Sequence, residues 1–125
     1  MLSHAFYNLV HVIGIILAML ALGGASILAM ATPAGATPRP TRRLLAILHG
    51  VGVFLVLLGG FGMLARLGIT QGGFPGWIWV KLAVWAVVAA ALFLPRRYPA
   101  IAKPLLLALP VLGGLAAYMA IYKPV

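Results

Sequence analysis

Four long apolar runs dominate the chain, at about residues 5–30, 44–68, 77–94 and 105–122. A bilayer core about 30 Å thick is crossed by roughly 20 apolar residues in an α-helix, and each run meets or approaches that length. The stretch IILAML at residues 15–20 lacks the alternation of a transmembrane β-strand. A helix also satisfies its own backbone hydrogen bonds inside lipid. The sequence therefore predicts an all-α integral membrane protein, a single four-helix bundle over residues 1–125.

Acidic side chains are absent from the sequence, which has nine Lys and Arg residues and is 65% hydrophobic. A soluble domain with this composition would have too few polar side chains to cover its surface. Without carboxylates or cysteines, the side chains cannot build a Ser/His/Asp triad, a carboxylate proton relay or a thiolate metal site. The ligand classes that this composition favours are anionic or electron-carrying molecules, such as a porphyrin, a quinone or a lipid phosphate.

Basic residues gather in two of the connections between the apolar runs. Connections 32–43 and 95–104 carry most of them: Arg39, Arg42, Arg43, Arg96, Arg97 and Lys103. The connection at 68–76 is Gly-rich and uncharged. By the positive-inside rule, the two basic connections face the cytoplasm, so both termini face the outer, periplasmic side of a multi-pass inner-membrane protein. Basic side chains at this boundary favour contact with membrane lipids rather than with nucleic acid.

The first apolar run also resembles a signal peptide, because Ala29-Met30-Ala31 has the spacing of a cleavage site. Residues 1–4 contain no Lys or Arg, however, and the apolar stretch is longer than a signal sequence needs. We therefore expect this run to be a retained membrane helix.

Small residues within the runs predict where helices approach closely, because packing drives helix association in lipid. The first run has a stripe at helical spacing that we expect to face inward: His4, Asn8, His11, Gly14 and Ala18. The other runs have these candidates for close packing: Gly52, Gly59 and Gly60, then Ala83, Ala86 and Ala90, then Gly113 and Gly114.

Ionisable side chains inside the apolar runs are candidates for function, because charge is costly in hydrocarbon. At 1.5 Å per residue, His11 lies roughly 9 Å and Lys81 roughly 6 Å below the outer boundary, so both can reach one ligand. His49 lies roughly 7 Å inside the opposite boundary, about 13 Å from the level of His11. The two histidines therefore cannot ligate one haem iron, and we expect His49 to be a packing residue.

Tryptophans flank Lys81 in the third run. Trp77, Lys81 and Trp85 follow one another at i, i+4 and i+8, a spacing that is typical of one wall of a pocket for a flat ring. A lysine that extends to the interface without a ligand is the structural alternative. For His11 the structural alternative is a neutral imidazole bonded to a backbone carbonyl.

Residues in the second run complete the predicted site. Met63 has a suitable depth to pair with His11 as a haem ligand, and Lys81 is the other candidate partner. Arg66, near the end of the second run, is expected to join the site from above. The predicted ligand-binding residues are His11, Lys81, Trp77, Trp85, Met63 and Arg66, with His11 as the metal ligand.

Two segments resemble a known family. Residues 7–12, YNLVHV, place His11 early in the first run, and residues 76–82, GWIWVKL, place Lys81 early in the third. In both respects the chain resembles the HemJ-type protoporphyrinogen oxidases, and the lysine segment is also similar to the small SirB-type membrane proteins. The HemJ resemblance implies haem b bound near His11 and Lys81, and oxidation of a tetrapyrrole with a quinone. Residues 22–26, LGGAS, depart from that family's aromatic, Pro-Arg-containing segment, so whether the chain is an enzyme stays open.

Two functions are therefore compatible with the sequence. One is a small integral membrane protein that binds haem b, a quinone or a tetrapyrrole-type ligand in the outer half of the bundle for redox work. The other is a non-catalytic accessory or assembly subunit of a larger membrane complex. Its partners would be other membrane subunits or a second copy of the chain.

Overall fold

The computed structural model describes residues 3–33, 36–68 and 73–123. Its helical elements are α1 (His4–Ala31), α2 (Arg39–Leu67), α3 (Gly76–Ala90), η1 (Ala91–Phe93), α4 (Leu94–Arg97), η2 (Pro99–Ile101) and α5 (Ala102–Tyr122). Four stretches are long and apolar enough to cross a membrane: His4–Ala31, Arg39–Leu67, Gly76–Phe93 and Pro99–Tyr122. The prediction of an all-helical chain with four helices long and apolar enough to cross a membrane is thereby confirmed.

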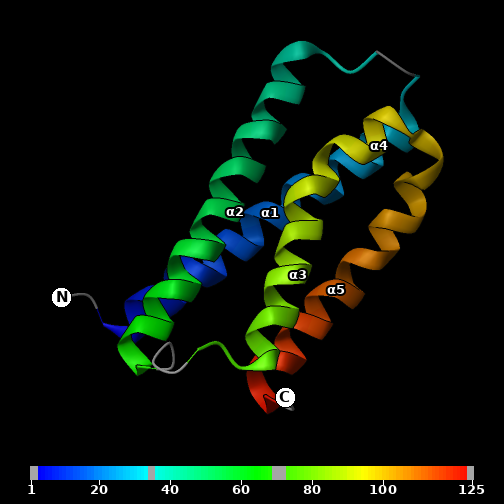
Figure 1. Ribbon diagram of the computed structural model, residues 1–125. Coiled ribbons are helices and arrows are strands. Elements are labelled where there is room, and N and C mark those ends of the chain that lie inside the picture. Colours follow the sequence, from blue (N-terminus) through cyan, green and yellow to red (C-terminus); the bar gives the residue numbers. More distant parts are fainter. Residues whose placement is uncertain (1–2, 34–35, 69–72, 124–125) are drawn as a thin grey trace.

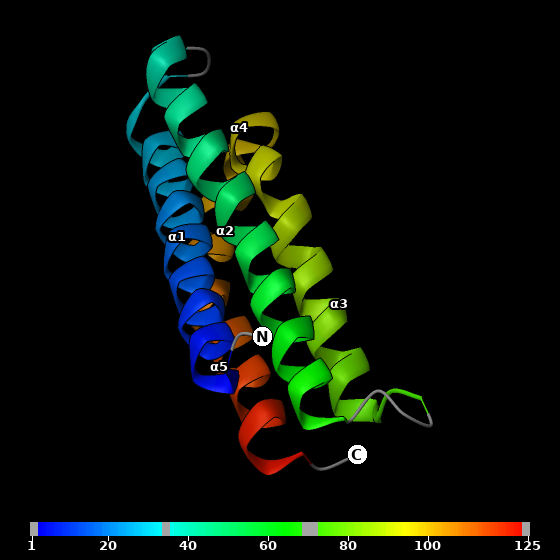
Figure 2. The ribbon, with the colours of Figure 1, turned by 90° about the vertical axis from the view of Figure 1, so that its left-hand side faces the viewer.

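The four long helices run side by side (Figures 1 and 2). The start of α1, the end of α2, the start of α3 and the end of α5 lie together, and we call this the terminal end. The end of α1, the start of α2, and η1, α4 and η2 lie at the opposite end, which we call the basic end. Both chain termini therefore lie at the same end of the bundle.

The helix boundaries follow from local capping. Ser3 begins α1, since its side-chain oxygen accepts a hydrogen bond from the Phe6 N–H at 3.1 Å. Pro40 fits the first turn of α2, where a backbone N–H is not needed, and Gly68 ends that helix in the left-handed region at φ 69°. The second helix thus begins at Arg39 rather than near residue 44. The sequence prediction began later because it followed the apolar run, which does not include the basic first turns of the helix.

The connections differ from the sequence prediction for the same reason. Arg39, Arg42 and Arg43, expected in a connection, lie in the first two turns of α2. The connection predicted at 95–104 is largely helical, since α4, η2 and the first turn of α5 occupy it. Part of the connection at 68–76, residues 69–72, lies outside the described residues.

Small residues form much of the interior, and large apolar side chains face outward. The buried residues of α1 are Gly14, Ala18, Ala21, Leu22 and Ser26. On the outside, Leu9 is 61% exposed and Val111 and Ile121 are each 71% exposed. This distribution is the reverse of a water-soluble core, and it suits helices whose outer faces contact lipid chains.

Glycines bring α1 and α2 into backbone contact. A Cβ atom added to Gly14 would lie 2.6 Å from the Val56 amide nitrogen, and one added to Gly52 would lie 2.6 Å from the amide nitrogen of Ala18. At Gly59 the added atom would lie 2.5 Å from the amide nitrogen of His11. Any side chain at these positions would therefore push the two helices apart.

The other predicted close-packing positions do not behave in this way. Ala83, Ala86 and Ala90 are exposed, because α3 turns Val84 and Val88 toward the core instead. No atom lies within 4 Å of a Cβ built at Gly114. The prediction of close contacts at these alanines and at Gly114 is therefore wrong. In the stripe of α1, His4 and Asn8 are exposed, and only the part from His11 onward turns inward.

We expect Gly59→Ala to destabilise the protein by about 1–3 kcal/mol, because overpacking at a backbone contact forces α1 and α2 apart. Gly50→Ala is the matched control on the same helix, since a Cβ at Gly50 meets no atom within 4 Å. The control should be neutral or stabilising by about 0.4–1 kcal/mol. Unfolding in detergent measures both, and equal stability of the two variants would contradict the packing.

Candidate functional site

A cavity of about 190 Å³ lies between α1, α2, α3 and α5. It occupies the terminal end, where α2 and α3 diverge in Figure 1, and we call it the terminal-end cavity. Five of the six predicted ligand-binding residues line it: His11, Met63, Trp77, Lys81 and Trp85. The structure thus gathers around one space residues that come from three different helices.

His11 is held in one orientation by α2. Its Nδ1 lies 2.7 Å from the carbonyl oxygen of Val56, and its backbone packs against Gly59. A carbonyl oxygen only accepts, so Nδ1 carries the proton and donates it. In the neutral ring, Nε2 then keeps its lone pair, and among the described residues it has no hydrogen-bond partner. An N–H bonded to a backbone carbonyl is the usual support of a metal-ligating histidine.

The two tryptophans fix the α3 wall of the cavity. Trp77 is buried and packs with Leu64 and Ile78. Trp85 donates from its Nε1 to the carbonyl oxygen of Val53 at 2.9 Å, which ties α3 to α2. Because each ring is held by packing or by a hydrogen bond, this wall is rigid before any ligand arrives.

Two lysines make the cavity cationic. Lys81 lines it from α3 and Lys123 from the end of α5, and Lys81 is close enough to His11 and Lys123 to interact with both electrostatically. The Lys123 ammonium donates to the Ala120 carbonyl at 2.8 Å and lies 5.3 Å from the centroid of the Trp77 ring. No carboxylate side chain exists in the sequence to balance these charges. An anionic group on a ligand would balance them.

Lys123 was not identified from the sequence. It follows the last apolar run and reads as a flanking charge at the membrane boundary. Its backbone is left-handed, with φ at 49°, and its side chain reaches back over Trp77. Only the packing of α5 beside α3 brings the two residues together, and the sequence contains no local signal for that contact.

Two other basic candidates lie elsewhere. Arg66 is exposed near the end of α2 and is not among the residues that line the cavity, so its role in the site stays a prediction. His49 is 4% exposed, and its Nε2 lies 2.9 Å from the carbonyl oxygen of Val88 on α3. Its Nε2 therefore carries the proton, and His49 joins α2 to α3 as a packing residue.

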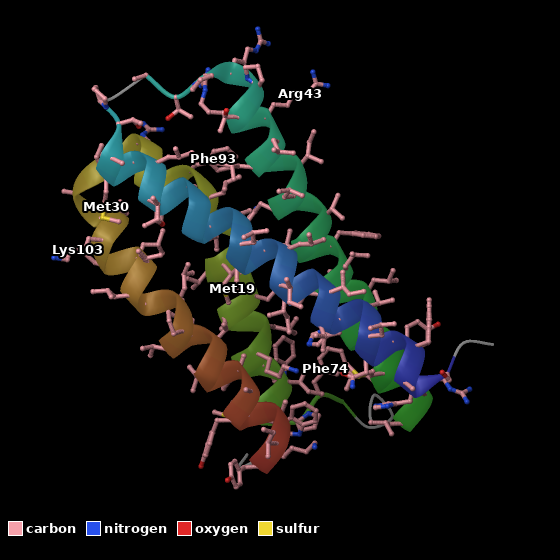
Figure 3. The ribbon with its side chains drawn as sticks, turned by 180° about the vertical axis from the view of Figure 1, so that it is seen from behind. Met19, Met30, Arg43, Phe74, Phe93 and Lys103 are labelled. Atoms are coloured by element: carbon pink, nitrogen blue, oxygen red, sulfur yellow. The ribbon has the colours of Figure 1, made fainter. Side chains whose placement is uncertain are left out.

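Two apolar residues that line the cavity also reach the outer surface of the protein. Phe61 and Leu67 line it and are 36% and 56% exposed. Phe74, labelled in Figure 3, lies at the same end, with its ring centroid 5.9 Å from that of Phe61. A ligand larger than the enclosed volume can therefore extend past apolar side chains into the surrounding lipid.

Ligand chemistry is limited by the donor set. No group of three His, Cys, Asp or Glu that could hold a metal ion occurs among residues 3–33, 36–68 and 73–123. A single histidine is nevertheless sufficient for a haem, because the porphyrin supplies four nitrogen ligands itself and the protein supplies only axial ones. His11, with Met63 lining the same cavity, fits that requirement.

Comparisons with protein-family models, with curated proteins and with solved structures found no match to this chain. The resemblance to the HemJ-type oxidases therefore stays a prediction based on residues 7–12 and 76–82.

We expect Lys81→Met to stabilise the ligand-free protein by about 1 kcal/mol, because a half-buried amine beside other basic groups is replaced by an apolar side chain of similar length. Lys103→Met is the matched control, since Lys103 is exposed at the basic end and points away from the bundle in Figure 3. Thermal unfolding in detergent provides the measurement. A Lys81→Met protein less stable than wild type would contradict an uncompensated cationic cavity.

Proposed function

We propose that this membrane protein binds haem b in the terminal-end cavity, where Nε2 of His11 would bind the iron. The observation that carries the proposal is the hydrogen bond between Nδ1 of His11 and the Val56 carbonyl. It fixes the tautomer that leaves Nε2 able to bind a metal, in a side chain that lines the cavity.

Five other residues that line the cavity have a role in this proposal. Met63 would be a second residue able to bind the iron. Lys81 and Lys123 would bind the propionates, and Trp77 and Trp85 would contact the faces or edges of the ring. When bound, haem supplies one-electron redox chemistry. The protein's own contribution is to orient the ring, balance its charge and exclude water.

A quinone is the second candidate ligand, and the size of the cavity favours it. Sites for drug-sized ligands enclose about 300–1,000 Å³, whereas this cavity encloses about 190 Å³. A quinone ring would occupy the enclosed part, with one carbonyl near Lys81, and its hydrocarbon tail would leave past Phe61 and Leu67. A haem would need the same route for part of its macrocycle.

The orientation and location in the cell follow from the distribution of charge. We infer that the basic end faces the cytoplasm and that the terminal end, with its cavity, faces the periplasm. Six of the nine basic residues lie within residues 39–43 and 96–103, at the basic end, which supports this orientation by the positive-inside rule. The inner membrane of a cell with two membranes is the location that this proposal implies.

We expect protein purified from cells with an adequate haem supply to show a Soret band in its visible spectrum. His11→Ala should abolish or shift the band, because the axial nitrogen is lost, and added imidazole should restore it. His49→Ala is the matched control and should leave the band unchanged, since His49 bonds Val88 away from the cavity.

Two results would contradict haem binding. One is the absence of a Soret band in correctly folded protein, and the other is a band in His11→Ala identical to that of the wild type. If no band appears and an organic extract of the purified protein contains a stoichiometric quinone, the ligand is the second candidate instead.

A further inference from the structure

A second cavity, of about 180 Å³, lies at the basic end. It is enclosed by the last turns of α1, the first turns of α2, and the segment from η1 to η2. We call it the basic-end cavity. It shares no lining residue with the terminal-end cavity, and the proposed function does not use it.

Arg42 lines this cavity and also has a buried hydrogen-bond donor without a partner among the described residues. Its side chain is half-buried and lines the cavity, and its Nε atom is buried with no hydrogen-bond partner in the described part of the chain. A buried donor on a charged group is costly when it is unpaired. An acceptor that entered the cavity would meet the same guanidinium group, which lines it.

Threonine hydroxyls add polar groups to the same wall. Thr32 and Thr37 both line the cavity. Thr32 donates from its Oγ1 to the Leu28 carbonyl, so its hydroxyl proton is already used. The Oγ1 of Thr37 lies 3.4 Å from that of Thr32, so Thr37 is the donor in this long, weak contact, and a ligand oxygen would be a better acceptor for its proton.

The charge around the cavity is wholly positive. Arg39, Arg42 and Arg43 occupy the first two turns of α2, where the helix dipole is also positive and where no acidic residue stands. Three cations at a helix N-terminus repel one another and the dipole. An anion bound beside Arg42 would offset both effects, and the sequence has no carboxylate side chain that could do so.

We propose that the basic-end cavity binds one phosphate group, supplied by the headgroup of an anionic phospholipid. Phosphate is the anion whose several acceptor oxygens can take hydrogen bonds from Arg42 and Thr37 together. Phe93 lines the cavity and is 68% exposed, so an apolar surface lies directly beside the polar wall. Figure 3 shows Phe93 at the basic end, where acyl chains would pass it. This combination fits an amphiphile better than it fits free phosphate.

The test compares two neighbouring arginines in purified, full-length protein in a zwitterionic detergent. Arg42→Gln removes the guanidinium that lines the cavity. Arg43→Gln makes the same charge change one residue away, at an exposed side chain that points away from the bundle in Figure 3. Phosphatidylglycerol, phosphatidylcholine and inorganic phosphate are titrated separately, with thermal stability and lipid retention in native mass spectrometry as the readouts.

We expect phosphatidylglycerol to stabilise the wild type and Arg43→Gln, with one lipid retained. Arg42→Gln should weaken the binding of phosphatidylglycerol about tenfold or more, because one charge-assisted hydrogen bond is lost. Thr37→Val should weaken it a fewfold, and this variant serves if Arg42→Gln does not fold. If inorganic phosphate stabilises the wild type but not Arg42→Gln, the cavity binds phosphate, and the phosphate comes from solution rather than from a lipid. Two results would overturn the proposal: equal binding of phosphatidylglycerol by Arg42→Gln and Arg43→Gln, or no response of the wild type to phosphatidylglycerol or inorganic phosphate.

Discussion

The backbone contact between α1 and α2 determines the geometry of the terminal end. Gly14, Gly52 and Gly59 let the two helices approach until only backbone atoms separate them. At that distance the imidazole of His11 reaches the Val56 carbonyl on the neighbouring helix. A wider separation would break this bond and free the ring to rotate. The packing of these glycines thus fixes the orientation of the His11 imidazole, the candidate metal ligand.

Positive charge without negative side chains is the second constraint on this protein. Lys81 and Lys123 line one cavity at the terminal end, and Arg42 has an unpaired donor at the basic end. The sequence has no carboxylate side chain that could pair with the two lysines or with Arg42. A helical membrane protein tolerates such groups where they serve a ligand, because packing elsewhere compensates for their cost. Both cavities are therefore suited to molecules that bring an anionic group with them.

The sequence predicted the architecture well, because membrane spans depend on the length and hydropathy of the runs alone. It also predicted which depths coincide, so His11 and Lys81 were expected at one level, and they line one cavity. Rotation about each helix axis was harder to predict. The alanines of α3 face outward because Val84 and Val88 pack better in the core, and hydropathy does not distinguish these faces. Lys123 depends on a contact between α3 and α5 that no local pattern records.

The tautomers of the histidines provide the most direct test of the central claim, that α2 holds His11 with Nε2 available to a ligand. Nitrogen-15 NMR of histidine-labelled, ligand-free protein at a pH where imidazoles are neutral distinguishes a protonated from a bare ring nitrogen. His11 should be protonated at Nδ1 and bare at Nε2. His49, which bonds Val88 through Nε2, should show the opposite tautomer in the same spectrum. A His11 resonance with a protonated Nε2 and a bare Nδ1 would contradict the account.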